Sequence, residues 1–179
     1  MDKLKAKELR VSNPTSEDIQ KIKRNEIYII LDNVWDTYNI GAIFRLADAV
    51  AAKKIYICGE SETPPNSRIQ KASVGTWQWT PWEKTNTALD AIMDLRNEIP
   101  GIQVVSVELD DKSIPYTKID YPLPIAIVVG HETEGVSNEA LEASDTIVEL
   151  PQLGINTSLN VMVSLGIVLY EALEKNNIS

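Results

Sequence analysis

The sequence predicts an α/β domain in which a parallel sheet is covered by helices on both faces. Short apolar runs alternate along the chain with longer segments whose apolar residues recur at helical spacing, an order typical of parallel sheets. Residues 26–31 (EIYIIL) and 124–129 (PIAIVV) are almost continuously apolar, as expected for strands buried on both faces. With 179 residues, of which 44% are hydrophobic, the chain favours one domain with a substantial core.

Five strands are expected, because each run is short, apolar and rich in β-branched residues. They span residues 26–31, 54–58, 102–107, 124–129 and 146–150. Gly59 closes the second strand and Pro151 stops the fifth. Cys58, at the end of the second strand, is expected to be a buried small hydrophobe.

Five helices are expected between and around these strands. They span residues 15–24, 39–52, 86–98, 138–143 and 158–174. The spacing of Ile40, Ile43 and Phe44 supports the second helix, and the third stops before a Pro-Gly pair. Ser158 is a candidate N-cap for the last helix, which would place Asn160 inside the first turn.

The formal charge of −9 argues against nucleic acid, but the charge is unevenly distributed. Residues 1–24 hold seven Lys or Arg against four acids, whereas the rest of the chain holds ten basic and 22 acidic residues. The basic residues of this head are Lys3, Lys5, Lys7, Arg10, Lys21, Lys23 and Arg24. We therefore divide the chain into a basic helical extension, residues 1–24, and a main domain, residues 25–179. The extension either contacts RNA or is a solvated helix face.

Several classes of protein are disfavoured by bulk features. No apolar stretch reaches the roughly 18–20 residues of a membrane span, and the charged N-terminal segment has no apolar block typical of a secretory signal. A cytoplasmic location is therefore expected. One cysteine and one histidine provide neither a disulfide framework nor a zinc site, so no metal is expected.

Three segments that follow expected strands combine glycines with Asn, Ser, Glu or Arg. Ligands of open parallel sheets bind beyond the carboxyl ends of the strands, so these segments are candidate binding turns. In the first, Asn39 and Arg45 lie six residues apart, on neighbouring faces of a helix. In the second, Gly130 and Gly135 flank Glu132, and glycine allows the backbone to approach a ligand closely.

The third segment combines a strand stop, a glycine bend and a polar helix start: Pro151, Gly154, Ser158, Leu159 and Asn160. Each segment has a purely structural alternative. Asn39 and Ser158 could be helix caps, Arg45 could extend along the surface or pair with an acid, and the glycine-flanked loop could be a plain turn. Capping by Ser158 does not explain Asn160, because Asn is a poor helix former and a buried amide needs partners.

Two other features carry weaker indications. His131 is the only histidine, but its sequence neighbours are not a nucleophile and an orienting acid, which argues against a general base. Trp77, Trp79 and Trp82 form a cluster in which the first two would share one face of a strand. Aromatic side chains can stack on bases, although core or dimer packing is the more usual explanation.

Taken in order, the three segments resemble the motifs of the TrmH (SpoU) family of SPOUT methyltransferases. The matching residues are Asn39, Gly41 and Arg45 for N-x-G-x-x-x-R, Gly130, Glu132 and Gly135 for G-x-E-x-x-G, and Pro151, Gly154, Ser158, Leu159 and Asn160 for P-x-x-G followed by S-L-N. Residues 71–75 (KASVG) resemble the segment between the first two motifs. The resemblance covers residues 26–173.

The resemblance implies a C-terminal deep trefoil knot that binds S-adenosyl-L-methionine, in a homodimer whose active site lies at the interface. The residues implied to bind the cofactor are Gly130, Leu150, Ser158, Leu159 and, less directly, Val107. In the implied catalytic set, Arg45 lies at the target ribose and Glu132 helps to hold it. Asn39 would orient the substrate or Arg45, and Asn160 would organise the knot and the site.

The implied activity is methyl transfer from S-adenosyl-L-methionine to a ribose 2′-hydroxyl of RNA, without a metal. Small size and the absence of the N-terminal RNA-binding domain of some relatives favour tRNA over rRNA. The cofactor supplies the electrophile, so the enzyme must align the 2′-oxygen and help to remove its proton. Because guanidinium has a pKa above about 12, Arg45 could be either an activated base or only a positioning group.

Two alternatives remain open. The first is a catalytically silent RNA- or protein-binding module of the same fold, which the acidic composition favours. The second is a doubly wound nucleotide-binding enzyme, although no G-x-G-x-x-G follows the first strand.

Overall fold

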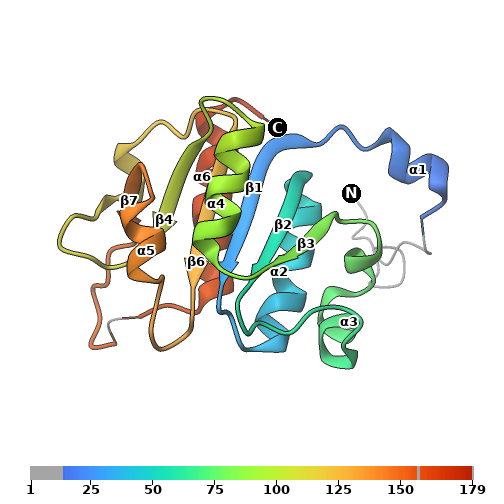
Figure 1. Cartoon of the computed structure of the whole chain (residues 1–179), viewed down its shortest axis with the longest axis horizontal. Coiled ribbons are helices and arrows are strands. Elements are labelled where there is room, and N and C mark those ends of the chain that lie inside the picture. Colours follow the sequence, from blue (N-terminus) through green and yellow to red (C-terminus); the bar gives the residue numbers. More distant parts are fainter. Residues whose placement is uncertain (1–13, 157, 179) are drawn as a thin grey trace, which may run out of the picture.

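The computed structural model describes residues 14–156 and 158–178, and Figure 1 shows a sheet with helices packed against it. The strands are β1 Asn25–Asp32, β2 Ala52–Cys58, β3 Trp82–Thr85, β4 Gln103–Val107, β5 Ile114–Pro115, β6 Ile125–Gly130 and β7 Thr146–Glu149. They form one seven-stranded sheet in the order β3-β2-β1-β6-β4-β7-β5. Every neighbouring pair is parallel, which confirms the expected sheet type.

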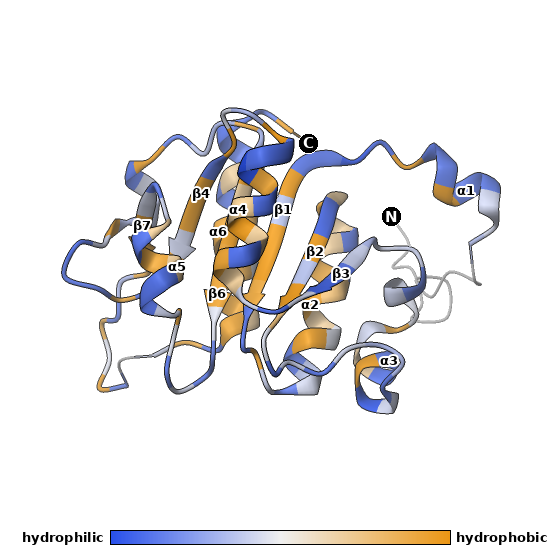
Figure 2. Cartoon of the chain, in the orientation of Figure 1, coloured by the Kyte–Doolittle hydropathy of each residue, from blue (hydrophilic) through white to orange (hydrophobic). Residues whose placement is uncertain are grey.

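Helices cover both faces of this sheet. They are α1 Ser16–Lys21, α2 Thr37–Ala49, α3 Ser67–Ser73, α4 Ala88–Glu98, α5 Asn138–Glu142 and α6 Val161–Lys175, with short 3-10 helices at Thr76–Gln78 and Tyr116–Lys118. Alternate residues of β1 point to opposite faces, as strand geometry requires. Ile29 packs in a buried cluster with residues of α2 and α6, and Ile30 packs in a second cluster with residues of α4 and α5. Figure 2 shows the apolar strands between these layers.

All five expected strands are present, and Cys58 is fully buried at the end of β2. Burial raises the pKa of the Cys58 thiol to about 12, which keeps it protonated and unreactive. The sequence analysis missed α3, β3 and β5, which are short elements without strong periodicity.

Two expected helix starts were wrong. α2 begins at Thr37 and is capped by Asp36, whose Oδ1 accepts from the Tyr38 N–H at 2.8 Å, so Asn39 is not the cap. α6 begins at Val161 and its cap is Asn160, not Ser158. In both cases another short polar residue, Asp36 or Asn160, accepts the first free amides of the helix.

The expected strand through Trp77 and Trp79 was also wrong. Trp77 lies in the 3-10 helix Thr76–Gln78, and Trp79 follows that helix as its C-cap. The Trp79 Nε1–H donates to Asp48 Oδ1 at 2.6 Å, which joins this segment to α2. Trp82 begins β3 instead. A turn with Gly75 at φ 94° breaks the alternation that a strand would need.

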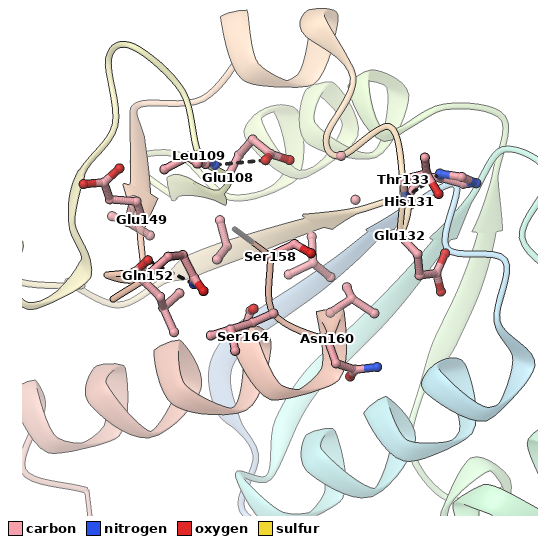
Figure 3. A pocket seen from close by; sticks show the side chains of 18 of the residues that line it. Glu108, Leu109, His131, Glu132, Thr133, Glu149, Gln152, Ser158, Asn160 and Ser164 are labelled. Atoms are coloured by element: carbon pink, nitrogen blue, oxygen red, sulfur yellow. Dashed lines mark hydrogen bonds between the residues drawn. The ribbon is translucent and has the colours of Figure 1, made fainter. Parts of the chain in front are cut away.

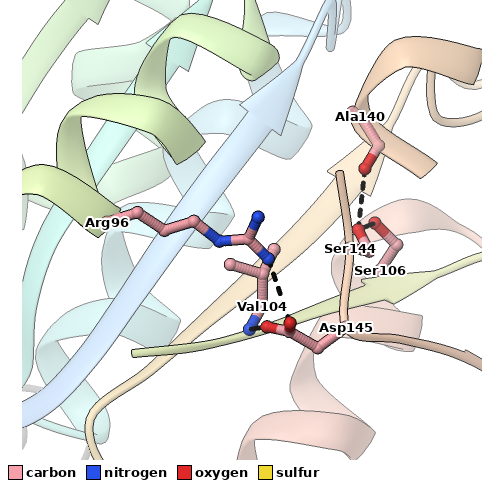
Figure 4. Close-up of polar contacts among 6 residues, drawn as sticks. All are labelled: Arg96, Val104, Ser106, Ala140, Ser144 and Asp145. Carbon is pink, nitrogen blue, oxygen red and sulfur yellow. Dashed lines mark hydrogen bonds and ion pairs between the residues drawn. The ribbon is translucent and has the colours of Figure 1, made fainter. Parts of the chain in front are cut away.

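Polar contacts fix β7 beside β4 (Figure 4). One Asp145 oxygen accepts from the Val104 N–H at 2.7 Å and the other accepts from Arg96 at 3.0 Å. Next to them, the hydroxyls of Ser106 and Ser144 lie 2.7 Å apart. These contacts fix the position of β7 along β4.

Part of the basic head lies outside the described residues, including Lys3, Lys5, Lys7 and Arg10. In the described part, Arg24 donates to the carbonyls of Ala52 and Trp79 at 3.1 and 2.6 Å. Arg24 therefore joins the head to the sheet and is not a free surface charge. Across residues 14–156 and 158–178, no helix has the length and apolarity needed to span a membrane.

Candidate active site

A hollow of about 400 Å³ lies at the carboxyl ends of β4, β6 and β7, beside the start of α6 (Figure 3). Ligands of parallel sheets bind at this edge, and the volume is in the range of small-molecule sites. All five residues expected to bind the cofactor line this hollow: Val107, Gly130, Leu150, Ser158 and Leu159. The structure thus brings together residues that are up to about fifty positions apart in the chain.

The wall formed by residues 130–137 is a tight backbone loop. His131 and Gly135 exchange two backbone hydrogen bonds, at 3.0 and 2.9 Å. A Cβ placed on Gly130 would lie 2.1 Å from the carbonyl carbon of Gly135, so only glycine allows this approach. Gly135 itself has a φ of 72°, which also favours glycine. The two glycines of the second motif therefore have a geometric explanation.

Two carboxylates, from the ends of the two strands that flank β6, hold the far side of this loop. Asp32, at the end of β1, accepts from the Ser137 N–H at 2.8 Å and from the Ser137 hydroxyl at 2.6 Å. Glu108, which follows β4, accepts from the Val136 N–H at 2.8 Å. Asp32 is only 2% exposed, and its oxygens accept from these donors and from the Asn33 side-chain amide at 3.2 Å. The loop is therefore held in place by contacts within the chain itself.

A third carboxylate, Glu132, connects the loop to the start of α2. Its Oε1 accepts from the Asn39 side-chain amide at 2.9 Å, and its two oxygens accept from the backbone N–H groups of Asp36 and Trp35 at 3.1 and 3.2 Å. The Asn39 oxygen in turn accepts from the Asn160 amide at 3.0 Å. Asn160 also caps α6, so one hydrogen-bonded chain joins all three motifs.

The donors around Glu132 stabilise its ionised form. Partial burial alone would raise the pKa of Glu132, but the hydrogen bonds from Asn39 and from nearby backbone amides outweigh burial. The net result is a pKa below the ordinary value of 4.5. Glu132 is therefore a carboxylate at neutral pH and serves as an acceptor, not as a proton donor.

Arg45 lies apart from this network. Its side chain is exposed on α2, and it is not among the residues that line the hollow. Within residues 14–156 and 158–178, Arg45 forms no ion pair, and the hydrogen bonds of Glu132 go to other groups. The expected Glu132–Arg45 contact is thus not made within the described part of one chain.

His131 is held by backbone donors and by an aromatic ring. Its Nδ1 accepts from the backbone N–H groups of Thr133 and Glu134, both at 3.1 Å. The ring also meets the Trp35 ring edge-on, with centroids 4.5 Å apart. In the part of the chain that the structure describes, no group of three or more His, Cys, Asp or Glu is arranged to hold a metal ion.

Sequence reasoning missed three residues that shape the site: Asp32, Glu108 and Trp35. The first two directly follow or end apolar strands, and a lone acid in that position is a signal that could have identified them. Trp35 gave no signal, because its importance depends on the contact of its backbone with Glu132, which is 97 residues away.

The chain is similar to known proteins in both sequence and structure. The model of the SpoU rRNA Methylase family matches residues 26–170. The chain belongs to the SpoU methylase family. The matched range contains all three motifs and every strand of the sheet except the first residue of β1.

Two curated relatives illustrate this membership. A tRNA (guanosine(18)-2'-O)-methyltransferase of Aquifex aeolicus is 31% identical over 155 residues, which are 87% of this chain and 72% of the relative. The enzyme of the same name in Escherichia coli strain K12 is 30% identical over 84% of this chain, which spans only 64% of that relative. The chain thus spans only part of the length of these relatives.

Two solved structures agree with the fold. The A. aeolicus TrmH/SpoU tRNA modifying enzyme has a TM-score of 0.79 at 30% identity, covering 89% of this chain and 79% of that one. An AdoMet-bound rRNA methyltransferase from Sinorhizobium meliloti has a TM-score of 0.77 at 32% identity, covering 86% of this chain and 57% of that one.

Proposed function

We propose that this protein transfers a methyl group from S-adenosyl-L-methionine to a ribose 2′-hydroxyl of RNA, with tRNA as a more probable substrate than rRNA. The observation that carries the proposal is the hydrogen-bonded chain Glu132–Asn39–Asn160, which joins the three motifs at the edge of a hollow. Family membership and the names of the tRNA methyltransferase relatives support the reaction and the preference for tRNA.

The hollow suits the methyl donor. Its volume of about 400 Å³ matches a small-molecule cofactor, and the Gly130–Gly135 approach leaves backbone at its wall. Glu108 and Glu149 line it and complement a cationic ligand. Gly130, Leu150, Ser158, Leu159 and Val107 are the residues proposed to hold the cofactor. When bound, it supplies an electrophilic methyl group.

The chain's own residues would align the acceptor. Arg45 is proposed to hold the target ribose by hydrogen bonding, because guanidinium stays protonated and donates only. Asn39, Glu132 and Asn160 keep α2 and α6 in register with the loop of residues 130–137. Such alignment can lower a barrier by up to roughly 7–11 kcal/mol.

A homodimer with a shared active site is part of the proposal. Tyr38 and Arg45 lie one heptad apart on the exposed face of α2, and α6 beside it exposes Ile167 and Tyr170. Exposed apolar groups gathered on two adjoining helices favour an interface. Pairing through this face would place Arg45 at the interface, and we propose that it reaches the partner's hollow there.

Subunit mixing tests that sharing. Arg45→Ala and Ser158→Tyr, whose ring would fill the hollow, should each be inactive alone. If each site combines Arg45 of one subunit with the hollow of the other, a mixed dimer has one intact site out of two. Because half of the dimers in an equal, fully exchanged mixture are mixed, the mixture should recover about a quarter of wild-type activity. No recovery in exchanged mixtures would contradict a shared site.

The domain division, the knot and the location complete the proposal. Residues 25–179 would be the methyltransferase domain and residues 1–24 a basic extension. The C-terminal trefoil knot is supported by similarity to SpoU structures, and a cytoplasmic location by the proposed tRNA substrate. A crystallographic chain trace tests the knot, and cell fractionation tests the location.

The reaction is tested by incubating the protein with labelled S-adenosyl-L-methionine and total tRNA or rRNA from a strain lacking the gene. Wild type should label RNA, and Arg45→Ala should not while still binding the cofactor. Cofactor binding without labelling of any RNA would contradict the proposal and favour a catalytically silent RNA- or protein-binding module.

A further inference from the structure

A second hollow lies next to the first, on the outer side of the β1–α2 turn. It has a volume of about 570 Å³ and is lined by side chains of this turn and of the loop that leads into α3: Trp35, Asp36, Thr37, Glu62, Asn66, Ser67 and Arg68. None of these residues belongs to the three motifs or to the proposed cofactor pocket. Trp35 and Asp36 hold Glu132 through their backbone N–H groups, but the side chains of this lining have no role in the reaction described so far.

Trp35 is the most unusual residue of this second hollow. Its side chain is 56% exposed, although indole is largely apolar. The Trp35 and His131 rings meet in a T-shaped contact, with an angle of 89° between the planes. His131 is itself fixed by backbone donors to its Nδ1, and the Trp35 N–H donates to Glu132. Trp35 is thus held by these contacts while more than half of its surface stays open.

The charged groups of the second hollow complement a nucleotide. Arg68 is exposed and makes no ion pair in residues 14–156 and 158–178. A guanidinium in that state can contact a phosphate. Glu62 is an exposed carboxylate that can accept from base N–H groups, whereas Asp36 already caps α2. Proteins bind single-stranded RNA through an aromatic ring, a cation and a hydrogen-bond acceptor of this kind.

The second hollow also adjoins the candidate active site. Trp35 and Asp36 line it and donate their backbone N–H groups to Glu132, which lines the first hollow. An RNA strand bound at Trp35 would therefore lie beside the Asn39–Glu132 contact of the candidate active site. We propose that this hollow binds an unpaired base of the RNA segment that carries the target ribose, with the base stacked on Trp35 and its phosphate at Arg68. This inference rests on the proposed function.

The test compares wild type with Trp35→Ala, Trp35→Phe and Arg68→Ala. The control is Met93→Ala, which removes a side chain that is 48% exposed on α4, outside both hollows. Three quantities are measured with unfractionated tRNA from a strain lacking the gene: the Kd for tRNA, the KM for tRNA in methyl transfer, and the Kd for S-adenosyl-L-methionine.

Trp35→Ala should raise the Kd and KM for tRNA about 10-fold, because the loss of one base–aromatic stack weakens RNA binding by about that factor. Trp35→Phe should recover most of the loss, and cofactor affinity should stay at the wild-type value. Arg68→Ala should reduce the slope of log affinity against log salt by roughly 0.7–1. Met93→Ala should match wild type.

The two proposals fail in different ways. If wild type transfers no methyl group, the proposed function is contradicted, and the Kd values for tRNA still decide whether Trp35 contacts RNA. If wild type methylates tRNA but Trp35→Ala has the same Kd and KM, the second hollow does not bind the base and the inference is overturned. Equal losses in Trp35→Ala and Trp35→Phe would also overturn stacking.

Discussion

Replacing Gly130 by alanine should damage the cofactor pocket through a backbone clash. The new Cβ would lie 2.1, 2.2 and 2.3 Å from the carbonyl carbon and oxygen of Gly135 and the nitrogen of Val136. These are backbone atoms, so no side-chain rotation can relieve the contact. The loop must move away from β6 as a unit.

The size of the effect follows from what holds the loop. Moving it breaks the two His131–Gly135 hydrogen bonds and strains the bond from Val136 to Glu108. Each hydrogen bond contributes about 1 kcal/mol, and overpacking typically costs about 1–3 kcal/mol. We therefore expect Gly130→Ala to lower the free energy of unfolding by about 3 kcal/mol and to weaken cofactor binding at least about 10-fold.

Urea denaturation and calorimetric titration with S-adenosyl-L-methionine measure the two effects. Gly154→Ala is the matched control, because a Cβ there meets nothing within 4 Å and the backbone φ is not positive. If Gly130→Ala unfolds at the same urea concentration as Gly154→Ala and binds the cofactor equally well, the argument from close approach is wrong.

Three further results are expected. Glu132→Gln should flatten the pH dependence of stability in acid. Because the pKa of Glu132 is lowered in the folded protein, the carboxylate stabilises the fold above pH 4.5, and this stabilisation is lost as the pH falls through the folded-state pKa. An unchanged profile of urea stability against pH would contradict the Asn39–Glu132 contact. Arg45→Ala should abolish methyl transfer with a melting temperature close to wild type, because the side chain is exposed; a large stability loss would show a structural role. Gly166→Ala should raise the free energy of unfolding measured in urea by about 0.5–1 kcal/mol, because alanine is favoured over glycine inside a helix. The new Cβ would lie at an ordinary 3.5 Å from Leu46, so no clash opposes this gain. Destabilisation would show that α2 and α6 pack more closely than described.

The strands were predictable because their signal is local. Burial on both faces requires continuous apolar residues, and residues 26–31 and 124–129 satisfy this requirement in the sequence itself. The five residues that the family resemblance implied for cofactor binding line one hollow at the carboxyl edge of the sheet. Their role in binding the cofactor stays a prediction.

Helix starts were less predictable, because several polar residues compete for the same cap. Asn39 was a candidate cap and Asn160 a candidate helical residue, but Asn39 lies inside α2 and Asn160 caps α6. Asp36 caps α2 instead, and the Asn39 and Asn160 amides also contact each other across 121 residues, which no local pattern indicates. The roles of Asp32 and Trp35 were likewise set by contacts with a distant loop.

The position of the methyl group on the product tests the central claim most directly. RNA methylated by the purified protein is digested to nucleosides, and the methylated nucleoside is analysed by mass spectrometry with fragmentation. The account predicts that the added mass stays with the ribose and that the product is absent with Arg45→Ala. A methyl group on the base, or a product of unchanged yield with Arg45→Ala, would contradict it.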